Sequence, residues 1–81
     1  METANELTVL FFGPLAEITG TGSVQITGCA DTDSLLEELT KKFPGLVHQI
    51  FLLAVDKNMI HSNTTLEGKK TIAFLPPYAG G

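Results

Sequence analysis

The stretch Thr71-Ile72-Ala73-Phe74-Leu75, followed by Pro76-Pro77-Tyr78-Ala79-Gly80-Gly81, decides how the rest of the chain is read. Its first five residues are mostly β-branched, aromatic or aliphatic, which predicts a strand. Because strand side chains alternate, Ile72 and Phe74 are expected on one face of a sheet. The two adjacent prolines then favour an extended conformation without internal hydrogen bonds. We therefore predict a last strand that runs directly into a projecting tail, residues 76–81.

The predicted tail ends in two glycines, Gly80 and Gly81. Because glycine has no Cβ, these residues can thread a channel that is too narrow for other side chains. If extended, the last five residues would reach roughly 15 Å from the domain, at about 3.1 to 3.5 Å per residue. The α-carboxylate of Gly81 would then be sterically open to attack. The competing interpretation is a frayed chain end without a function, since chain ends are often poorly ordered.

Length and composition indicate one small globular domain. The chain has 81 residues, of which 43% are hydrophobic and 17% are charged, and this length is near the lower limit for burying a core. Its net charge of −4 argues against nucleic acid and an anionic membrane as partners, because basic patches bind both. A single cysteine excludes an internal disulfide framework. No signal-like opening and no membrane-spanning apolar run is evident, so we expect a cytoplasmic protein.

The remaining chain predicts further strands and one main helix. The strands are expected at residues 7–12, 23–27, 51–55, 59–60 and 71–75. A short helix is expected over residues 14–19 and the longest helix over residues 32–43. Thr32, Asp33 or Ser34 is expected to cap the long helix at its N-terminus.

One long helix must cover one face of a mixed sheet, because no other predicted element is long enough to do so. Pairing the first and last strands at the centre of the sheet gives an α+β fold of the β-grasp (ubiquitin-like) type. The domain would span residues 7–75, between a loose leader at residues 1–6 and the tail. The core facing the helix is expected to contain Val9, Phe11, Ile26, Leu36, Leu39, Phe43, Ile72 and Phe74.

The opposite face of this predicted sheet keeps apolar side chains beside the tail. They are Leu10, Phe12, Ala73 and Leu75. An exposed apolar patch of this kind marks a site for interaction with another protein. The sequence therefore predicts a docking face next to the tail.

No group of side chains has the spacing of a catalytic or metal site. His48 and His61 lack a cysteine or carboxylate at ligand spacing, so we interpret both as surface or packing residues. Cys29 has no partner histidine by spacing, and we interpret it as structural. The reactive group that remains is the carboxylate of Gly81, which must be activated as a mixed anhydride, for example with AMP. The base, metal and nucleotide site for that step must belong to other proteins.

The sequence resembles the ubiquitin-like sulfur carriers and, among them, the small subunit of molybdopterin synthase (the MoaD type). The resemblance covers residues 7–81. Its most specific parts are the pair Phe11-Phe12 and the ending Pro76-Pro77-Tyr78-Ala79-Gly80-Gly81. A terminal Gly-Gly by itself also fits the carriers of the thiamin pathway and the ubiquitin-like modifiers.

The resemblance implies a β-grasp fold and a cycle of sulfur transfer. An E1-like adenylyltransferase would use ATP to adenylate Gly81, and a cysteine desulfurase or rhodanese-type donor would supply sulfur for a thiocarboxylate. The tail from Pro76 onward would then insert into the large subunit of molybdopterin synthase, in a heterotetramer, and deliver sulfur to cyclic pyranopterin monophosphate. The chain itself would hold no cofactor stably. In this family the open sheet face contacts the partner, here through Phe12 and Leu75.

Two positions depart from the family pattern. The turn before the last strand usually reads Gly-Asp-Glu, and here it is Gly68-Lys69-Lys70, which we interpret as a solvated turn; the position of Leu75 is often aromatic. Both changes bear on partner affinity, and neither affects the terminal carboxylate. Two other functions stay open: a carrier for another product, such as the thiazole of thiamin or a thiolated nucleotide, and a protein modifier joined through Gly81 to lysines.

Overall fold

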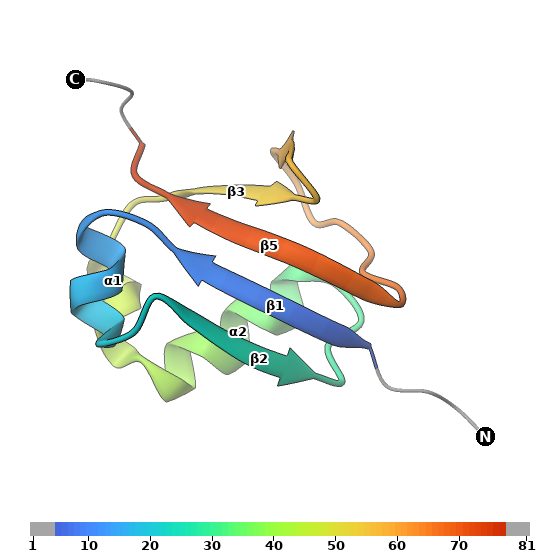
Figure 1. The fold of residues 1–81 in the computed structure, drawn as a ribbon, viewed down its shortest axis with the longest axis horizontal. Helices are drawn as coiled ribbons and strands as arrows, with labels where there is room; N and C mark the ends of the chain where they lie inside the picture. Colours follow the sequence, from blue (N-terminus) through green and yellow to red (C-terminus); the bar gives the residue numbers. More distant parts are fainter. Residues whose placement is uncertain (1–4, 78–81) are drawn as a thin grey trace.

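The first and last strands lie side by side in the middle of one sheet (Figure 1). The computed structural model describes residues 5–77, and within them five strands have the order β2-β1-β5-β3-β4. Their bounds are β1 Glu6–Phe11, β2 Ser23–Thr27, β3 Leu52–Val55, β4 Asn58–Ile60 and β5 Lys69–Leu75. β1 and β5 are parallel, whereas the other paired strands are antiparallel. The predicted central pairing of the first and last strands is confirmed.

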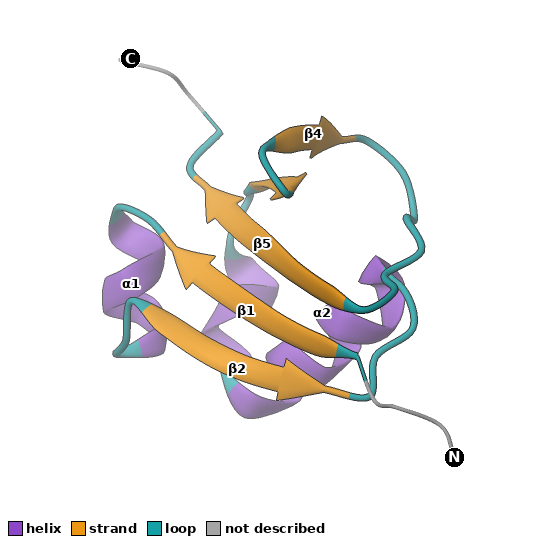
Figure 2. Ribbon diagram, turned by 45° about the vertical axis from the view of Figure 1, so that its right-hand side comes forward, coloured by secondary structure: helices purple, strands orange, loops and turns teal. Residues whose placement is uncertain are grey.

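Helical segments cover one face of this sheet (Figure 2). They are α1 (Pro14–Thr19), α2 (Thr32–Lys42) and the 3-10 helix η1 (Pro44–His48). Pro14 starts α1, where its missing N–H costs nothing. Gly20 ends the same helix in the left-handed conformation, at φ 78°. Among the described residues, no helix is long and apolar enough to cross a membrane.

The core lies between the helices and the sheet. Phe74 on β5 is at its centre, with 0% of its surface exposed, and its ring centroid is 5.3 Å from that of Phe11 and 4.9 Å from that of Phe51. Of the predicted core residues, Leu36 and Phe43 are only partly buried, because they lie at the edge of the helix–sheet interface. Further residues complete the core, namely Leu7, Leu15, Cys29, Leu35, Leu46, Val55 and Leu66.

Several predicted boundaries differ from the structure by one or two residues, and the starts of the first and last strands matter most. β1 begins at Glu6 and β5 at Lys69, because Glu6 and Lys69 are partners in the parallel pair. Lys69 and Lys70 are therefore strand residues and not turn residues. The leader predicted over residues 1–6 is also too long, since the side-chain amide of Asn5 donates hydrogen bonds to the carbonyls of Cys29 (2.7 Å) and Leu66 (2.6 Å).

The N-cap of α2 is Asp31, and the predicted caps Thr32, Asp33 and Ser34 were wrong. Asp31 is extended, and its Oδ1 accepts a hydrogen bond of 2.9 Å from the backbone N–H of Ser34. Thr32 cannot serve as the cap because it is already helical and buried, and its hydroxyl accepts from the backbone N–H of Thr64. The cap was missed because it lies one residue before the predicted start.

Asn63 ties the loop after β4 to the start of α2. Its Oδ1 accepts from the backbone N–H of Asp33 (2.8 Å) and from the hydroxyl of Thr32 (3.1 Å), while its Nδ2 donates to Oδ2 of Asp31 (3.1 Å). The pKa of the Asp31 carboxyl is lowered, mainly by the hydrogen bond from Ser34 and secondly by the hydrogen bond from Asn63. A carboxyl with a lowered folded-state pKa stabilises the fold above its unfolded pKa, and this contribution is lost as the pH falls through the folded pKa.

We expect Asp31→Asn to be less stable than the wild type at neutral pH. The asparagine can still cap the helix, but it carries no charge and turns an N–H toward the Asn63 amide. The difference in Tm should shrink as the pH falls below about 4, the ordinary pKa range of an unfolded aspartate, and should be lost as the pH falls through the lowered pKa of the folded-state carboxyl. Thermal unfolding at neutral and acid pH measures this, with Asp33→Asn, which removes a neighbouring carboxylate without a capping bond, as the control. A Tm difference that is independent of pH would contradict the assignment.

Candidate docking face and tail root

The predicted apolar patch is assembled on the sheet face opposite the helices. Leu10 on β1 is opposite Ala73 on β5, and Leu75 is opposite Leu52 on β3. Strand alternation produces this arrangement, because the residues between them, such as Ile72 and Phe74, point into the core. Phe12 follows β1 directly, and 43% of its surface is exposed. All four predicted docking residues therefore lie together.

These residues line a hollow of about 530 Å³, which we call the sheet-face groove. Its lining consists of Leu10, Phe12, Ala54, Asp56, Lys57, Met59, Thr71, Ala73 and Leu75. Beyond the four predicted residues, the lining includes five that sequence reasoning missed, of which Ala54 and Met59 are apolar. Ala54 is opposite Ala73 in the register of β3 and β5, and Met59 is opposite Ala54 on β4. The alternation within residues 51–55 was the available signal for Ala54, whereas a strand as short as β4 gives almost none.

Asp56 organises the charged end of the sheet-face groove. Asp56 and Lys57 form the tight β3–β4 turn, with φ of 48° and 72°. Asp56 Oδ1 accepts from the backbone N–H of Thr71 (2.9 Å), and Lys70 Nζ lies 3.4 Å from Oδ2. These contacts, the hydrogen bond from Thr71 first, lower the pKa of Asp56. Lys69, the residue before Lys70, has its Nζ 3.8 Å from Oε1 of Glu6. Each of the two lysines that depart from the family pattern therefore has a carboxylate neighbour.

The tail starts where β5 leaves the sheet. Pro76 and Pro77 are the described part of the predicted tail, and Tyr78, Ala79, Gly80 and Gly81 lie outside the described residues. The backbone N–H of Phe12 donates to the carbonyl of Phe74 (3.1 Å), which extends the β1–β5 pairing to this point. Gly13, at φ 59°, lets the chain pass close to Pro76: a Cβ at Gly13 would lie 3.1 Å from Pro76 Cγ.

A second hollow lies beside these prolines, on the helix side of the sheet. It measures about 320 Å³ and is lined by Pro14, Leu15, His48, Gln49, Ile50, Pro76 and Pro77. We call it the tail-root groove. Ile50 has 76% of its surface exposed, and no signal in the sequence distinguished it from a core residue. The tail therefore leaves the domain between two hollows, one on each side of the sheet.

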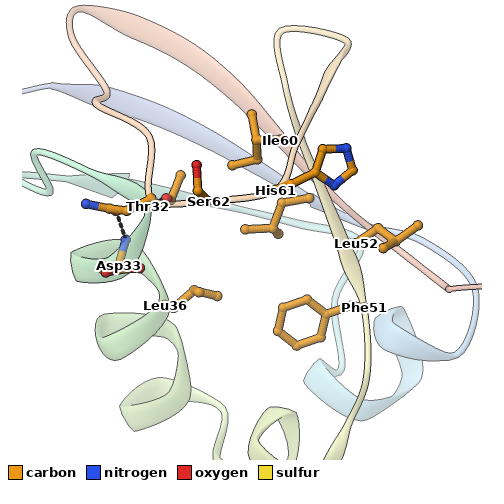
Figure 3. Close-up of a pocket in the computed structure, with 10 residues that line it drawn as sticks. Thr32, Asp33, Leu36, Phe51, Leu52, Ile60, His61 and Ser62 are labelled. Carbon is orange, nitrogen blue, oxygen red and sulfur yellow. Dashed lines mark hydrogen bonds between the residues drawn. The ribbon is translucent and has the colours of Figure 1, made fainter.

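A third hollow separates α2 from the β3–β4 edge (Figure 3). Leu36 on α2 and Phe51 before β3 contribute apolar walls, and His61 is an exposed lining residue.

Within the described part of the chain, no cluster of three or more His, Cys, Asp or Glu side chains could hold a metal ion. The pKa of the Cys29 thiol is raised, mainly by burial and then by the charges of Glu38 and Asp31. A raised pKa disfavours the thiolate form that a reactive cysteine needs.

Comparison with known proteins places these features in a family. The ThiS family matches residues 9–81. Small archaeal modifier protein 1 from Methanosarcina acetivorans has a TM-score of 0.82 at 26% identity, over 99% of this chain and 100% of that chain. No curated protein matches the sequence closely enough to count as a relative.

Two proteins named as molybdopterin-converting factors are also similar. The complex of subunits 1 and 2 from Helicobacter pylori 26695 has a TM-score of 0.74 at 28% identity, over 94% of this chain and 99% of that chain. Putative subunit 1 from Pyrococcus furiosus has a TM-score of 0.83 at 16% identity, over 91% and 99%, which supports the fold alone. These likenesses confirm the predicted β-grasp architecture.

Proposed function

The chain belongs to the ThiS family, and from that premise we propose that it is a sulfur carrier of molybdenum cofactor biosynthesis. In this proposal Gly81 is the C-terminal residue and its carboxylate is converted into a thiocarboxylate. The thiocarboxylate then gives its sulfur to cyclic pyranopterin monophosphate within molybdopterin synthase. No side chain of the chain itself performs chemistry.

One observation carries the proposal: the strand that lines the sheet-face groove continues directly into the proline pair. Ala73 and Leu75 on β5 line the groove, and Pro76 and Pro77 follow them. A partner that covers this apolar face is therefore held next to the start of the tail. Such docking holds the end of the tail near the partner's reacting groups. Reacting groups that are held in place lose less entropy on reaching the transition state, so the barrier is lower.

The chemistry requires activation of a poor electrophile. An E1-like adenylyltransferase would let the Gly81 carboxylate attack the α-phosphorus of ATP, which releases pyrophosphate and leaves an acyl-adenylate. The terminal sulfur of a persulfide on a cysteine desulfurase or rhodanese-type donor would then attack the acyl carbon and displace AMP. A thiol reductant would cleave the resulting acyl disulfide, which leaves the thiocarboxylate and the donor's thiol. ATP is a substrate of the activating enzyme here, and no cofactor is held by the carrier.

The large subunit of molybdopterin synthase is the proposed sulfur-receiving partner. The Helicobacter pylori neighbour, at 28% identity, is described as a complex of subunits 1 and 2 of molybdopterin-converting factor, which supports this choice. Phe12 and Leu75, on the sheet-face groove, are proposed to contact the large subunit, and the tail residues Pro76 to Gly81 to enter it. A heterotetramer of two small and two large subunits is the proposed assembly.

A protein modifier is the second candidate. It is favoured by the 26% identity to small archaeal modifier protein 1. A modifier would form isopeptide bonds between Gly81 and lysines of other proteins. It predicts conjugates of higher mass in cell extract, which a dedicated sulfur carrier should not form.

Intact-mass measurement tests the carrier proposal. The full chain is incubated with ATP, the cognate adenylyltransferase and a sulfur donor, and replacement of one oxygen by sulfur should add about 16 Da. Omission of ATP should abolish the gain. If the adenylyltransferase is active on another carrier and the gain is still absent, the proposal is wrong. Recovery of thiazole synthase, without a large synthase subunit, in a pull-down would instead favour a carrier of the thiamin pathway.

A further inference from the structure

We infer that the tail-root groove is a contact surface for the enzyme that adenylates Gly81, on the opposite side of the tail from the sheet-face groove. This inference rests on the proposed function, because it takes Gly81 as the residue whose carboxylate is activated. The contact it adds is to Ile50 and Pro14, neither of which lies on the sheet face.

The first argument is the reach of the tail. Four residues follow Pro77 up to Gly81, and an extended chain covers at most about 3.5 Å per residue. The reacting carboxylate therefore lies no more than roughly 14 Å from Pro77. An enzyme that encloses this carboxylate in a channel must bring the channel entrance up to the proline pair. The residues around that entrance therefore contact the surface next to Pro76 and Pro77.

The second argument is the reactivity of the product. An acyl-adenylate is a mixed anhydride that water hydrolyses, so the channel mouth must exclude water while the intermediate exists. A contact on the sheet-face side alone leaves the other side of the tail open. The tail-root groove is the hollow on that open side, and Pro76 and Pro77 form part of its wall. An enzyme that seals the tail must cover it.

The third argument is the chemistry of the groove surface. Its lining carries no carboxylate, lysine or arginine, and apolar side chains predominate: Pro14, Leu15, Ile50, Pro76 and Pro77. Ile50 is 76% exposed, more than any other large hydrophobic residue in the described part of the chain. Such exposure costs solvation free energy unless a partner covers it. The matching partner surface is an uncharged apolar side chain on the rim of the channel.

Val47 offers a matched control. It is also β-branched, lies on η1 three residues before Ile50 and has 64% of its surface exposed, but it does not line the groove. Aspartate at either position should leave the fold intact, because neither side chain belongs to the core. The two variants therefore differ in whether the new charge lies in the groove.

Adenylation kinetics with the cognate E1-like enzyme test the inference, with pyrophosphate release measured against carrier concentration. We expect Ile50→Asp to raise KM for the carrier by about tenfold or more, the effect of removing a buried apolar contact. The value of kcat should stay within about twofold, because the tail and the reacting groups are unchanged. Ile50→Leu should keep the wild-type KM, and Val47→Asp should change it by less than about twofold. Unchanged Tm values confirm that the variants are folded.

The outcomes separate the inference from the proposed function. If the wild type releases no pyrophosphate with a competent enzyme, the proposed function fails. If the wild type is adenylated and Ile50→Asp has a normal KM, the inference alone is overturned. Equal losses in Ile50→Asp and Val47→Asp would also overturn it, since the effect would then not depend on the groove. A loss of kcat at unchanged KM would overturn it as well, because a docking contact acts on binding.

Discussion

A single serine added after Gly81 is expected to abolish thiocarboxylate formation completely. The added residue moves the carboxylate about 3.5 Å further along the tail and puts a side chain where the channel would hold a glycine. Pro76 lies close to Gly13 at the end of the sheet, so the start of the tail keeps its place when a residue is added and the extra length displaces the reacting end. A misplacement of this size costs orders of magnitude in rate.

The test measures the gain of about 16 Da by intact mass in an assay without a protease that could trim the extension. A serine added before Met1 is the matched control, since it makes the same change in composition at the other end of the chain. That control should be converted at the wild-type rate. Conversion of the C-terminally extended chain, with the extension still present in the product mass, would contradict the assignment of Gly81 as the reactive residue.

Phe74→Ala is expected to remove most of the stability of the domain. The side chain has no exposed surface and packs against the rings of Phe11 and Phe51. Truncation of a buried phenylalanine typically costs about 3 to 5 kcal/mol, from lost burial and from the cavity left behind. Small domains unfold with about 5 to 15 kcal/mol in total, so the variant should be partly unfolded at physiological temperature.

Urea unfolding followed by circular dichroism measures this difference. Phe12→Ala is the matched control, because it removes the same atoms from a side chain that is 43% exposed. Its loss in unfolding free energy should be below about 1.5 kcal/mol, in proportion to the smaller area that it buries. Similar losses for the two variants would mean that the core is not centred on Phe74. Phe12→Ala should instead weaken binding to the large subunit.

The sequence predicted the elements whose side chains repeat with a clear period. Ile72 and Phe74 on one face of the last strand, with Ala73 and Leu75 on the other, follow from alternation alone. The helix predicted over residues 32–43 differs from α2 by one residue at its C-terminal end. The predicted central pairing of the first and last strands gives the β-grasp arrangement with one helix on one face, and the structure has this pairing. The sheet-face patch of Leu10, Phe12, Ala73 and Leu75 was predicted by the same periodicity.

Other features depend on neighbours that are distant in the sequence. Lys69 belongs to a strand because Glu6 is its partner in β1, and neither residue signals this locally. Asp31 caps α2 in competition with three other candidates, and Asn63, from a distant loop, adds to its hydrogen bonding. Propensity at Asp31, Thr32, Asp33 and Ser34 is too similar to decide between them. The end of an element is therefore less predictable than its centre.

By itself, the sequence determined the fold class, the core face of each long strand and the apolar character of the docking face, because hydrophobic periods are local properties of the chain. Only the tertiary structure decided that the tail leaves the domain between two grooves. The tail-root groove is built from segments near Pro14, Ile50 and Pro76, which are separated by more than twenty residues each. No local sequence pattern predicts that these three segments are adjacent, because their proximity depends on how the whole chain packs.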